Sequence, residues 1–397
     1  MTARVAAACL CSILLASAAA RAAPAPAEAG LSATAQLGRQ IFFDSSLSES
    51  GQLSCASCHS PAAAYASPDG GFAPMAGARL NQPPLRTVPS LRYLDHTPRF
   101  TRHYYLDHGE EREDEGPAGG FMLDGRADSL HTQALLPWLD ATEMGNPSIE
   151  ALSARLQRAP YAQRLQQLFG ATVLDDPRQA VAGAALALER FELEDPSFHP
   201  YSSRYDQFLA GQETLTQQEL RGLKLFVDPL KGNCAECHPN TAGPGGRGPD
   251  FTDYAYRALG VPRNPEIAAN ADPNFHDLGV CGPRRVDLRA ETQYCGYFKT
   301  PTLRNVARRT RFFHNGRFRT LEQVLQFYAE RDTSPQLWYP TVRGRVSKYD
   351  DLPRRYRDRV DVSDPPFNRR RGDAPALSGP EIEDLVAFLR TLDDAGQ

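Results

Sequence analysis

One five-residue pattern, C-x-x-C-H, occurs twice in this sequence, at residues 55–59 and 234–238. It is the attachment pattern of c-type haem. Two thiols on one turn can each bond a vinyl group of the same porphyrin, and the His that follows is held beneath the iron as an axial ligand. The sequence therefore predicts two covalent haem c groups. The predicted attachment residues are Cys55, Cys58, Cys234 and Cys237, and the predicted iron ligands are His59 and His238.

The same residue types also occur in zinc sites and in redox-active dithiols. A zinc site needs both cysteine pairs to converge on one ion, but these pairs lie far apart in the sequence and each has its own His. A redox-active dithiol does not need a His directly after its second Cys, and here that His is present twice. Haem attachment is therefore the interpretation that accounts for both copies.

The first 22 residues are typical of a secretory signal peptide. Arg4 provides the basic start, residues 5–20 provide the apolar stretch, and Ala20-Arg21-Ala22 provides the cleavage site. A single membrane anchor is the alternative, which the small residues and prolines that follow disfavour. We therefore expect export to the periplasm and no membrane span in the mature chain.

The mature chain is expected to be mildly acidic. Without residues 1–22 it has 42 Lys and Arg against 48 Asp and Glu, a net charge of −6. A protein with this charge is a poor binder of nucleic acid. Four of its six cysteines belong to the haem motifs, and an oxidising compartment would pair the other two. We therefore predict no nucleic-acid partner and a disulfide between Cys281 and Cys295.

Similar helices surround the two motifs. An amphipathic helix with a Gly and an aromatic residue precedes each motif, at residues 36–43 and 220–226, and each half ends in another helix, near 177–193 and 378–392. Small c-type cytochromes pack a first and a last helix across each other over one haem. The sequence therefore predicts a mainly α fold with two cytochrome c-like domains, long loops and one covalent haem c in each. The predicted boundaries are 1–22 for the signal peptide, 23–205 for the N-terminal domain and 206–397 for the C-terminal domain.

Methionine positions restrict the ligands of the second haem. An iron with two protein ligands transfers electrons, whereas an iron with an open position can bind peroxide. The sequence has four Met residues, at positions 1, 75, 122 and 144, so none follows the second motif. A His/Met ligand pair within its own domain is therefore excluded for the second haem.

Four further segments resemble the bacterial di-haem cytochrome c peroxidase and MauG family, and the resemblance covers nearly all of the mature chain. It implies hydrogen peroxide as the oxidant, a peroxidatic haem in the N-terminal domain and an electron-transfer haem in the C-terminal domain. The segments are residues 37–44, residues 124–145 with Asp124-Gly125-Arg126-Ala127 and Glu143-Met144-Gly145, residues 299–306, and residues 313–322 with Phe313-His314-Asn315-Gly316.

The resemblance implies a Tyr ligand for the second haem. Peroxidases of the family place Met fourteen residues past the His of a His-x-Gly turn, and MauG-like enzymes place Tyr there. Counted from His314, this position is Tyr328. Independently, Thr320 and Gln323 predict a helix start, and apolar residues share one helix face with Tyr328. Tyr328 is therefore interpreted as an iron ligand, with a plain core tyrosine as the alternative.

The resemblance assigns catalysis at the first haem to Glu143, Gln133 and Pro137. Glu143 matches the acid–base group of the family. Peroxide must lose a proton at one oxygen and gain one at the other as its O–O bond breaks, and a carboxylate beside the open face can do both. By pattern alone Glu143 is an ordinary charge at a helix end, so its role depends on the resemblance.

The chain departs from the family pattern beside both haems. No His lies between His59 and His96 to block the first haem. This haem is therefore expected to rest open unless Met75 binds it. Leu123 occupies the position where the family usually has a Trp between the haems, so the usual route between them is in question.

The family also binds a calcium ion between its domains. One ligand is an Asn, and Thr87 stands in its place here. The other two ligands are backbone carbonyls, which match Arg309 and Arg311 and survive substitution. Whether Ca²⁺ binds is left open.

Together these features predict a periplasmic di-haem c peroxidase-type oxidoreductase with MauG-like ligands. It would use hydrogen peroxide to oxidise a small redox protein or a side chain of a partner protein. A non-catalytic di-haem electron-transfer cytochrome is the alternative, against which Glu143, Gln133 and the missing loop His argue.

Overall fold

The computed structural model describes residues 30–68, 70, 72–108 and 111–395. The predicted signal peptide, residues 1–22, lies outside the described residues. The described residues from Leu31 onward form one compact unit. In the described part of the chain no helix is both long and apolar enough to cross a membrane.

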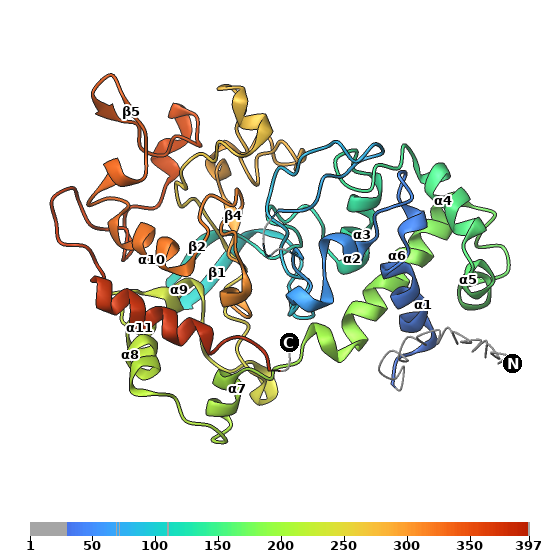
Figure 1. The fold of residues 1–397 in the computed structure, drawn as a ribbon, viewed down its shortest axis with the longest axis horizontal. Helices are drawn as coiled ribbons and strands as arrows, with labels where there is room; N and C mark the ends of the chain where they lie inside the picture. Colours follow the sequence, from blue (N-terminus) through green and yellow to red (C-terminus); the bar gives the residue numbers. More distant parts are fainter. Residues whose placement is uncertain (1–29, 69, 71, 109–110, 396–397) are drawn as a thin grey trace, which may run out of the picture. The chain divides into compact units, whose positions relative to one another are not determined.

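The predicted mainly α fold is confirmed, and helices are the main regular elements of the described residues (Figure 1). The α-helices are α1 Ala33–Phe42, α2 Cys55–Cys58, α3 Leu130–Leu139, α4 Ile149–Arg158, α5 Ala162–Phe169, α6 Pro177–Glu194, α7 Arg204–Leu209, α8 Gln217–Val227, α9 Cys234–Cys237, α10 Leu321–Glu330 and α11 Gly379–Arg390. The strands are β1 Thr101–His108, β2 Glu111–Ala118, β3 Tyr256–Arg257, β4 Phe298–Lys299, β5 Thr341–Val342 and β6 Arg345–Val346.

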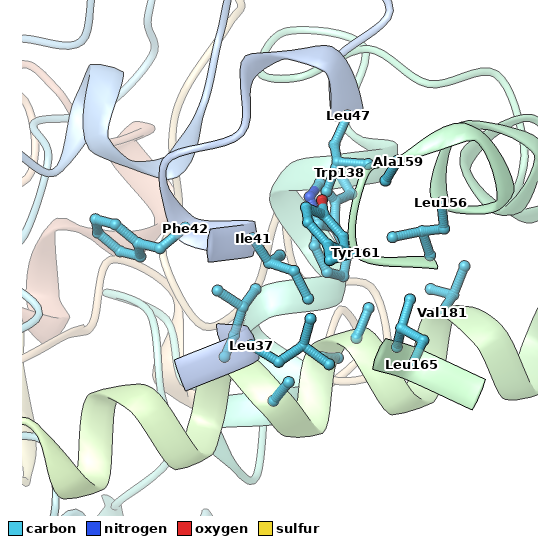
Figure 2. Packing of buried hydrophobic residues seen from close by; sticks show 14 of the residues in the cluster. Leu37, Ile41, Phe42, Leu47, Trp138, Leu156, Ala159, Tyr161, Leu165 and Val181 are labelled. Atoms are coloured by element: carbon cyan, nitrogen blue, oxygen red, sulfur yellow. The ribbon is translucent and has the colours of Figure 1, made fainter. Parts of the chain in front are cut away.

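Helix α1 crosses α6 at Gly38. A Cβ atom on Gly38 would lie 1.8 Å from the carbonyl oxygen of Ala187, so only glycine lets the two backbones come this close. Leu37, Ile41 and Phe42 of α1 are buried in the first hydrophobic cluster, which also contains Trp138. Figure 2 shows Leu37 and Ile41 gathered with other apolar side chains beside α6.

Helices α8 and α11 repeat this crossing in the second half of the chain, where Figure 1 shows them side by side. A Cβ atom on Gly222 would lie 2.0 Å from the carbonyl oxygen of Asp384. Leu385, Val386 and Leu389 of α11 are buried against α8 in a second hydrophobic cluster. The two crossings match the predicted pairs of helices.

The strands form three two-stranded sheets in the described residues, and only β1 and β2 are longer than two residues. The antiparallel hairpin β1–β2 was not predicted, because its sequence, TRHYYLDH followed by EREDEGPA, lacks the alternation of apolar and polar residues that marks a half-buried strand. Strand β3 pairs with β4 and sets Tyr256 opposite Lys299. This pairing fixes the start of the 299–306 segment.

Helix α7 spans the predicted boundary between residues 205 and 206. Its Tyr205 is buried in the second hydrophobic cluster, where its ring meets those of Phe251 and Phe388. Helix α7 therefore packs as a whole with the second half of the chain.

Asp394, fully buried near the end of the described chain, links the two halves. It accepts hydrogen bonds from Arg92 at 3.0 Å and Tyr93 at 2.6 Å, both from the first half, and from Asn305 of the second half at 2.6 Å. Cys281 and Cys295, the remaining cysteine pair, form a disulfide.

Candidate active site

The first C-x-x-C-H motif forms helix α2, and His59 is its C-cap. The imidazole Nδ1–H donates to the carbonyl oxygen of Tyr65 at 3.0 Å. Burial lowers the pKa of His59 to about 4, so the ring is neutral. With Nδ1 holding the proton, Nε2 keeps a lone pair with which it can bind a metal.

The second motif has the same geometry. Helix α9 holds Cys234 and Cys237, and His238 is its C-cap. The Nδ1–H of His238 donates to the carbonyl oxygen of Phe251 at 2.8 Å, and burial lowers the pKa of this imidazole too. None of the four motif cysteines forms a disulfide, so all four remain available for attachment.

The first cavity joins the first motif to the predicted catalytic residues. Helix α3 carries Gln133 and Pro137, and Glu143 follows on the next turn, where its N–H donates to the carbonyl oxygen of Asp140 at 2.9 Å. Because proline has no N–H, Pro137 cannot bond the carbonyl of Gln133 one turn earlier. The lining residues include Cys58, His59, Gln133, Pro137 and Glu143.

Glu143 is surrounded by cationic side chains. Burial raises its pKa, and the nearby Arg126 and Arg86 oppose this shift. Arg284 is 3.9 Å from the Glu143 carboxylate, while it also pairs with Asp140. A carboxyl that lines a cavity and has a raised pKa suits proton transfer.

The second cavity joins the second motif to Tyr328. Its lining includes Cys234, Cys237 and His238, together with α10 residues on one face. Tyr328 lies on this face, as predicted, with its ring 5.8 Å from the ring of Phe313 and 5.3 Å from that of Phe367. Burial raises the pKa of its phenol. The α10 residues that line the cavity are Leu321, Val324, Leu325 and Tyr328.

Eight residues line both cavities, and we call them the partition. Leu123 belongs to it, whereas Trp138 lines neither cavity and is buried in the first hydrophobic cluster. The N–H of Lys299 donates to the carbonyl oxygen of Leu123 at 2.9 Å, which fixes this leucine in place. The partition consists of Thr87, Pro89, Leu123, Lys299, Thr300, Pro301, Thr302 and Arg309.

Two cations of the partition lack an acidic partner at hydrogen-bond distance among the described residues. Burial lowers the pKa of Lys299 to about 8, partly opposed by Asp124, and its Nζ donates to the carbonyl oxygen of Gly120 at 2.5 Å. Burial alone lowers the pKa of Arg309 to about 10. An enclosed guanidinium of this kind is stabilised by a bound carboxylate.

The residues of both cavities fit haem c. The second cavity offers both motif thiols, and the first offers that of Cys58, while Cys55 packs against the first hydrophobic cluster. Each cavity also has an imidazole with a free Nε2 lone pair and a largely apolar wall, and Arg309 between them can pair with propionate groups. Haem would be held by Cys55, Cys58 and His59 in the first cavity, and by Cys234, Cys237 and His238 in the second.

Two expectations about loop residues can be compared with their positions. Met75 is 49% exposed and does not line the first cavity, so its thioether does not face His59. The hydroxyl of Thr87 donates to the carbonyl oxygen of Phe313 at 2.8 Å. This bond directs Thr87 to the backbone that precedes His314.

Comparison with known proteins identifies the family. A family model described as di-haem cytochrome c peroxidase matches residues 32–214. The methylamine utilization protein MauG of Paracoccus denitrificans is 33% identical over 373 residues, which cover 91% of this chain and 89% of that protein. The chain belongs to the di-haem cytochrome c peroxidase family.

Other members of the di-haem peroxidase family agree with this assignment. MauG of Methylophilus methylotrophus is 29% identical over 363 residues, 90% of this chain and 82% of that protein. The crystal structure of the diheme peroxidase BthA from Burkholderia thailandensis is 41% identical, with a TM-score of 0.80 over 91% of this chain and 86% of that one. The protein is therefore a di-haem peroxidase, and its family implies two haem c groups.

Sequence reasoning did not identify Arg284 as a residue of the first cavity. Arg284 reaches Asp140 and the Thr142 hydroxyl from a loop of the second half, and no local pattern marks it. Lys299 was noted only as the first residue of a family segment, and its burial could not be read from the chain.

Proposed function

We propose that the chain is a periplasmic di-haem peroxidase in which peroxide reacts in the first cavity and Glu143 moves its protons. The observation that carries this proposal is the convergence of Gln133, Pro137 and Glu143 on the cavity that holds Cys58 and His59. Export depends on the signal-like residues 1–22.

Haem c supplies an iron that exchanges electrons and, where an axial position is open, binds peroxide. Glu143 accepts the proton of one peroxide oxygen and returns it to the other. The raised pKa of Glu143 makes its carboxylate a stronger base, which favours acceptance of the first proton from peroxide. The Gln133 amide, buried beside the Met122 thioether, offers an N–H to the same space.

Tyr328 is proposed as the sixth ligand of the second haem. Its phenol has no hydrogen-bond partner among the described residues, and it shares a cavity with Cys234, Cys237 and His238. A phenolate is an anionic oxygen donor that suits ferric iron. We further propose one haem in each of two cytochrome c-like domains, predicted as 23–205 and 206–397. Because α7 begins at Arg204 and packs with the second half, we place their boundary just before this helix. The proposed electron source is a small redox protein or a side chain of a partner protein.

Covalent attachment can be tested by intact mass. The denatured mature protein should carry two haem additions, because thioether bonds survive unfolding. The double variant Cys234→Ser/Cys237→Ser should keep one addition, which serves as the matched control. A wild-type mass with one haem or none would contradict the attachment proposed at both motifs.

The proposed peroxide reaction can be tested by stopped-flow spectroscopy of the ferric protein. One equivalent of peroxide should change the spectra of both haems rapidly and without prior reduction, because Met75 does not face the first cavity. An electron-transfer cytochrome with two six-coordinate irons would show little change. A change confined to one haem would mean that Leu123 interrupts the pair.

A further inference from the structure

A groove lined by cationic side chains lies beside the β5–β6 hairpin, which Figure 1 shows on the α10 side of the unit. The groove has a volume of about 820 Å³. From the sequence alone its basic run, residues 369–371, is a solvated turn. In the structure this run faces cations of β6 and the following loop. The cationic lining residues are Arg345, Lys348, Arg369, Arg370 and Arg371.

Most of this charge is uncompensated. The guanidinium groups of Arg345, Arg370 and Arg371 form no ion pair or hydrogen bond with the described residues. The one acid that lines the groove, Asp332, is buried and already pairs with Arg331 and Lys348. Asp373 lies on the same turn, where its carboxylate accepts the backbone N–H of Arg370 at 2.7 Å. The groove is therefore a cationic surface that its own residues do not neutralise.

The sign of this region is opposite to that of the whole chain. Residues 343–371 contain ten Lys and Arg against five Asp, whereas the full sequence has 44 Lys and Arg against 48 Asp and Glu. The net negative charge of the chain therefore repels an acidic protein, whereas the basic region 343–371 attracts it. This difference orients the approach of the acidic protein. Exposed apolar side chains at Val362, in the groove, and at Val342 and Leu337 nearby add contact area of the kind found in protein interfaces.

The groove also shares a wall with the second haem cavity. Residues 364–367 line the cavity, and Val362 and residues 368–371 on either side line the groove. The ring of Phe367 lies 5.3 Å from that of Tyr328 and 4.0 Å from the Arg331 guanidinium. The segment 362–371 thus lies between a protein bound in the groove and the second haem cavity.

We propose that this groove is the docking surface for an acidic redox protein that delivers electrons to the second haem. The proposal depends on the peroxidase function proposed above. Each donor molecule gives one electron, and two electrons with two protons convert one H₂O₂ into two water molecules. The groove thereby selects donors whose own docking face carries carboxylates.

The test uses one donor protein in two charge forms. Reduced mitochondrial cytochrome c is rich in lysine, and succinylation converts those amines to carboxylates while leaving its haem in place. Peroxide turnover is followed with each form, and with uncharged hydroquinone as a reference donor. The groove variant is Arg345→Gln/Arg370→Gln/Arg371→Gln. The matched control, Arg354→Gln/Arg355→Gln/Arg359→Gln, removes three charges from the same region outside the groove lining.

At low ionic strength the wild type should have a KM about tenfold lower for the succinylated form than for the native form, and salt should abolish the difference. In the groove variant the KM for the succinylated form should rise about tenfold, while turnover with hydroquinone stays at the wild-type rate. The control should stay close to wild type. A preference for the native form, equal losses in both variants, or binding of the succinylated form without turnover would overturn the proposal. If the wild type does not turn over peroxide with hydroquinone, the peroxidase function itself is refuted.

Discussion

Glu143→Gln should slow the reaction with peroxide by roughly 10²-fold or more while both haems stay bound, which is the scale of a lost proton-transfer group. The amide fills the same volume but cannot accept the proton of peroxide. The carboxylate is also expected to set the pH dependence. Because burial raises its pKa, the fraction able to accept a proton, and with it the rate, should fall as pH decreases through that raised value.

The control for this variant is Glu150→Gln. Glu150 is an exposed carboxylate at the start of α4 and lines neither cavity. Stopped-flow traces of the ferric proteins should then separate the two variants, with Glu150→Gln at the wild-type rate. An unchanged rate in Glu143→Gln, with resting spectra preserved, would remove Glu143 from the chemistry.

Tyr328→Phe should remove the low-spin signal of the second haem from the low-temperature EPR spectrum of the ferric protein. The wild type is expected to hold one high-spin and one low-spin iron, the latter bound by His238 and Tyr328. Phenylalanine keeps the ring contacts with Phe313 and Phe367 but has no donor oxygen. The high-spin signal of the first haem should be unaffected.

Tyr205→Phe is the matched control for this experiment. Tyr205 is a buried tyrosine of the second hydrophobic cluster, and its hydroxyl accepts a hydrogen bond from Asn240 rather than facing the second cavity. Its EPR spectrum should match that of the wild type. If Tyr328→Phe also leaves both signals untouched, Tyr328 is a core residue, and a wild type with two low-spin irons would argue against an open first haem.

The sequence was informative wherever the interactions are local. The helix starts at Thr216–Glu219 and Ser378–Glu381 are capping boxes closed within one turn, a pattern that can be recognised in the sequence. The inward face of α10 follows from spacing alone, because residues three and four apart share one face of a helix. Gly38 and Gly222 belong to the repeated helices recognised in the sequence, although the backbone approach that requires them needs the folded chain.

What escaped prediction depends on contacts between distant segments. Arg284 contacts Asp140 and Glu143 only after the two halves pack together. The sequence around Arg284 therefore does not predict these contacts. The β1–β2 hairpin is held by backbone pairing and has no apolar stripe. The basic groove combines β6 with residues 368–371, and neither segment alone distinguishes a docking surface from a solvated turn.

The partition has an evolutionary consequence. Because Leu123, Lys299 and Arg309 face both cavities, a single mutation at any of them alters the surroundings of two cofactors at once. Selection on one reaction centre therefore also acts on the other at these positions. Independent adaptation is confined to residues that contact one cavity, such as Glu143 on one side and Tyr328 on the other. The two centres are inherited as a coupled pair.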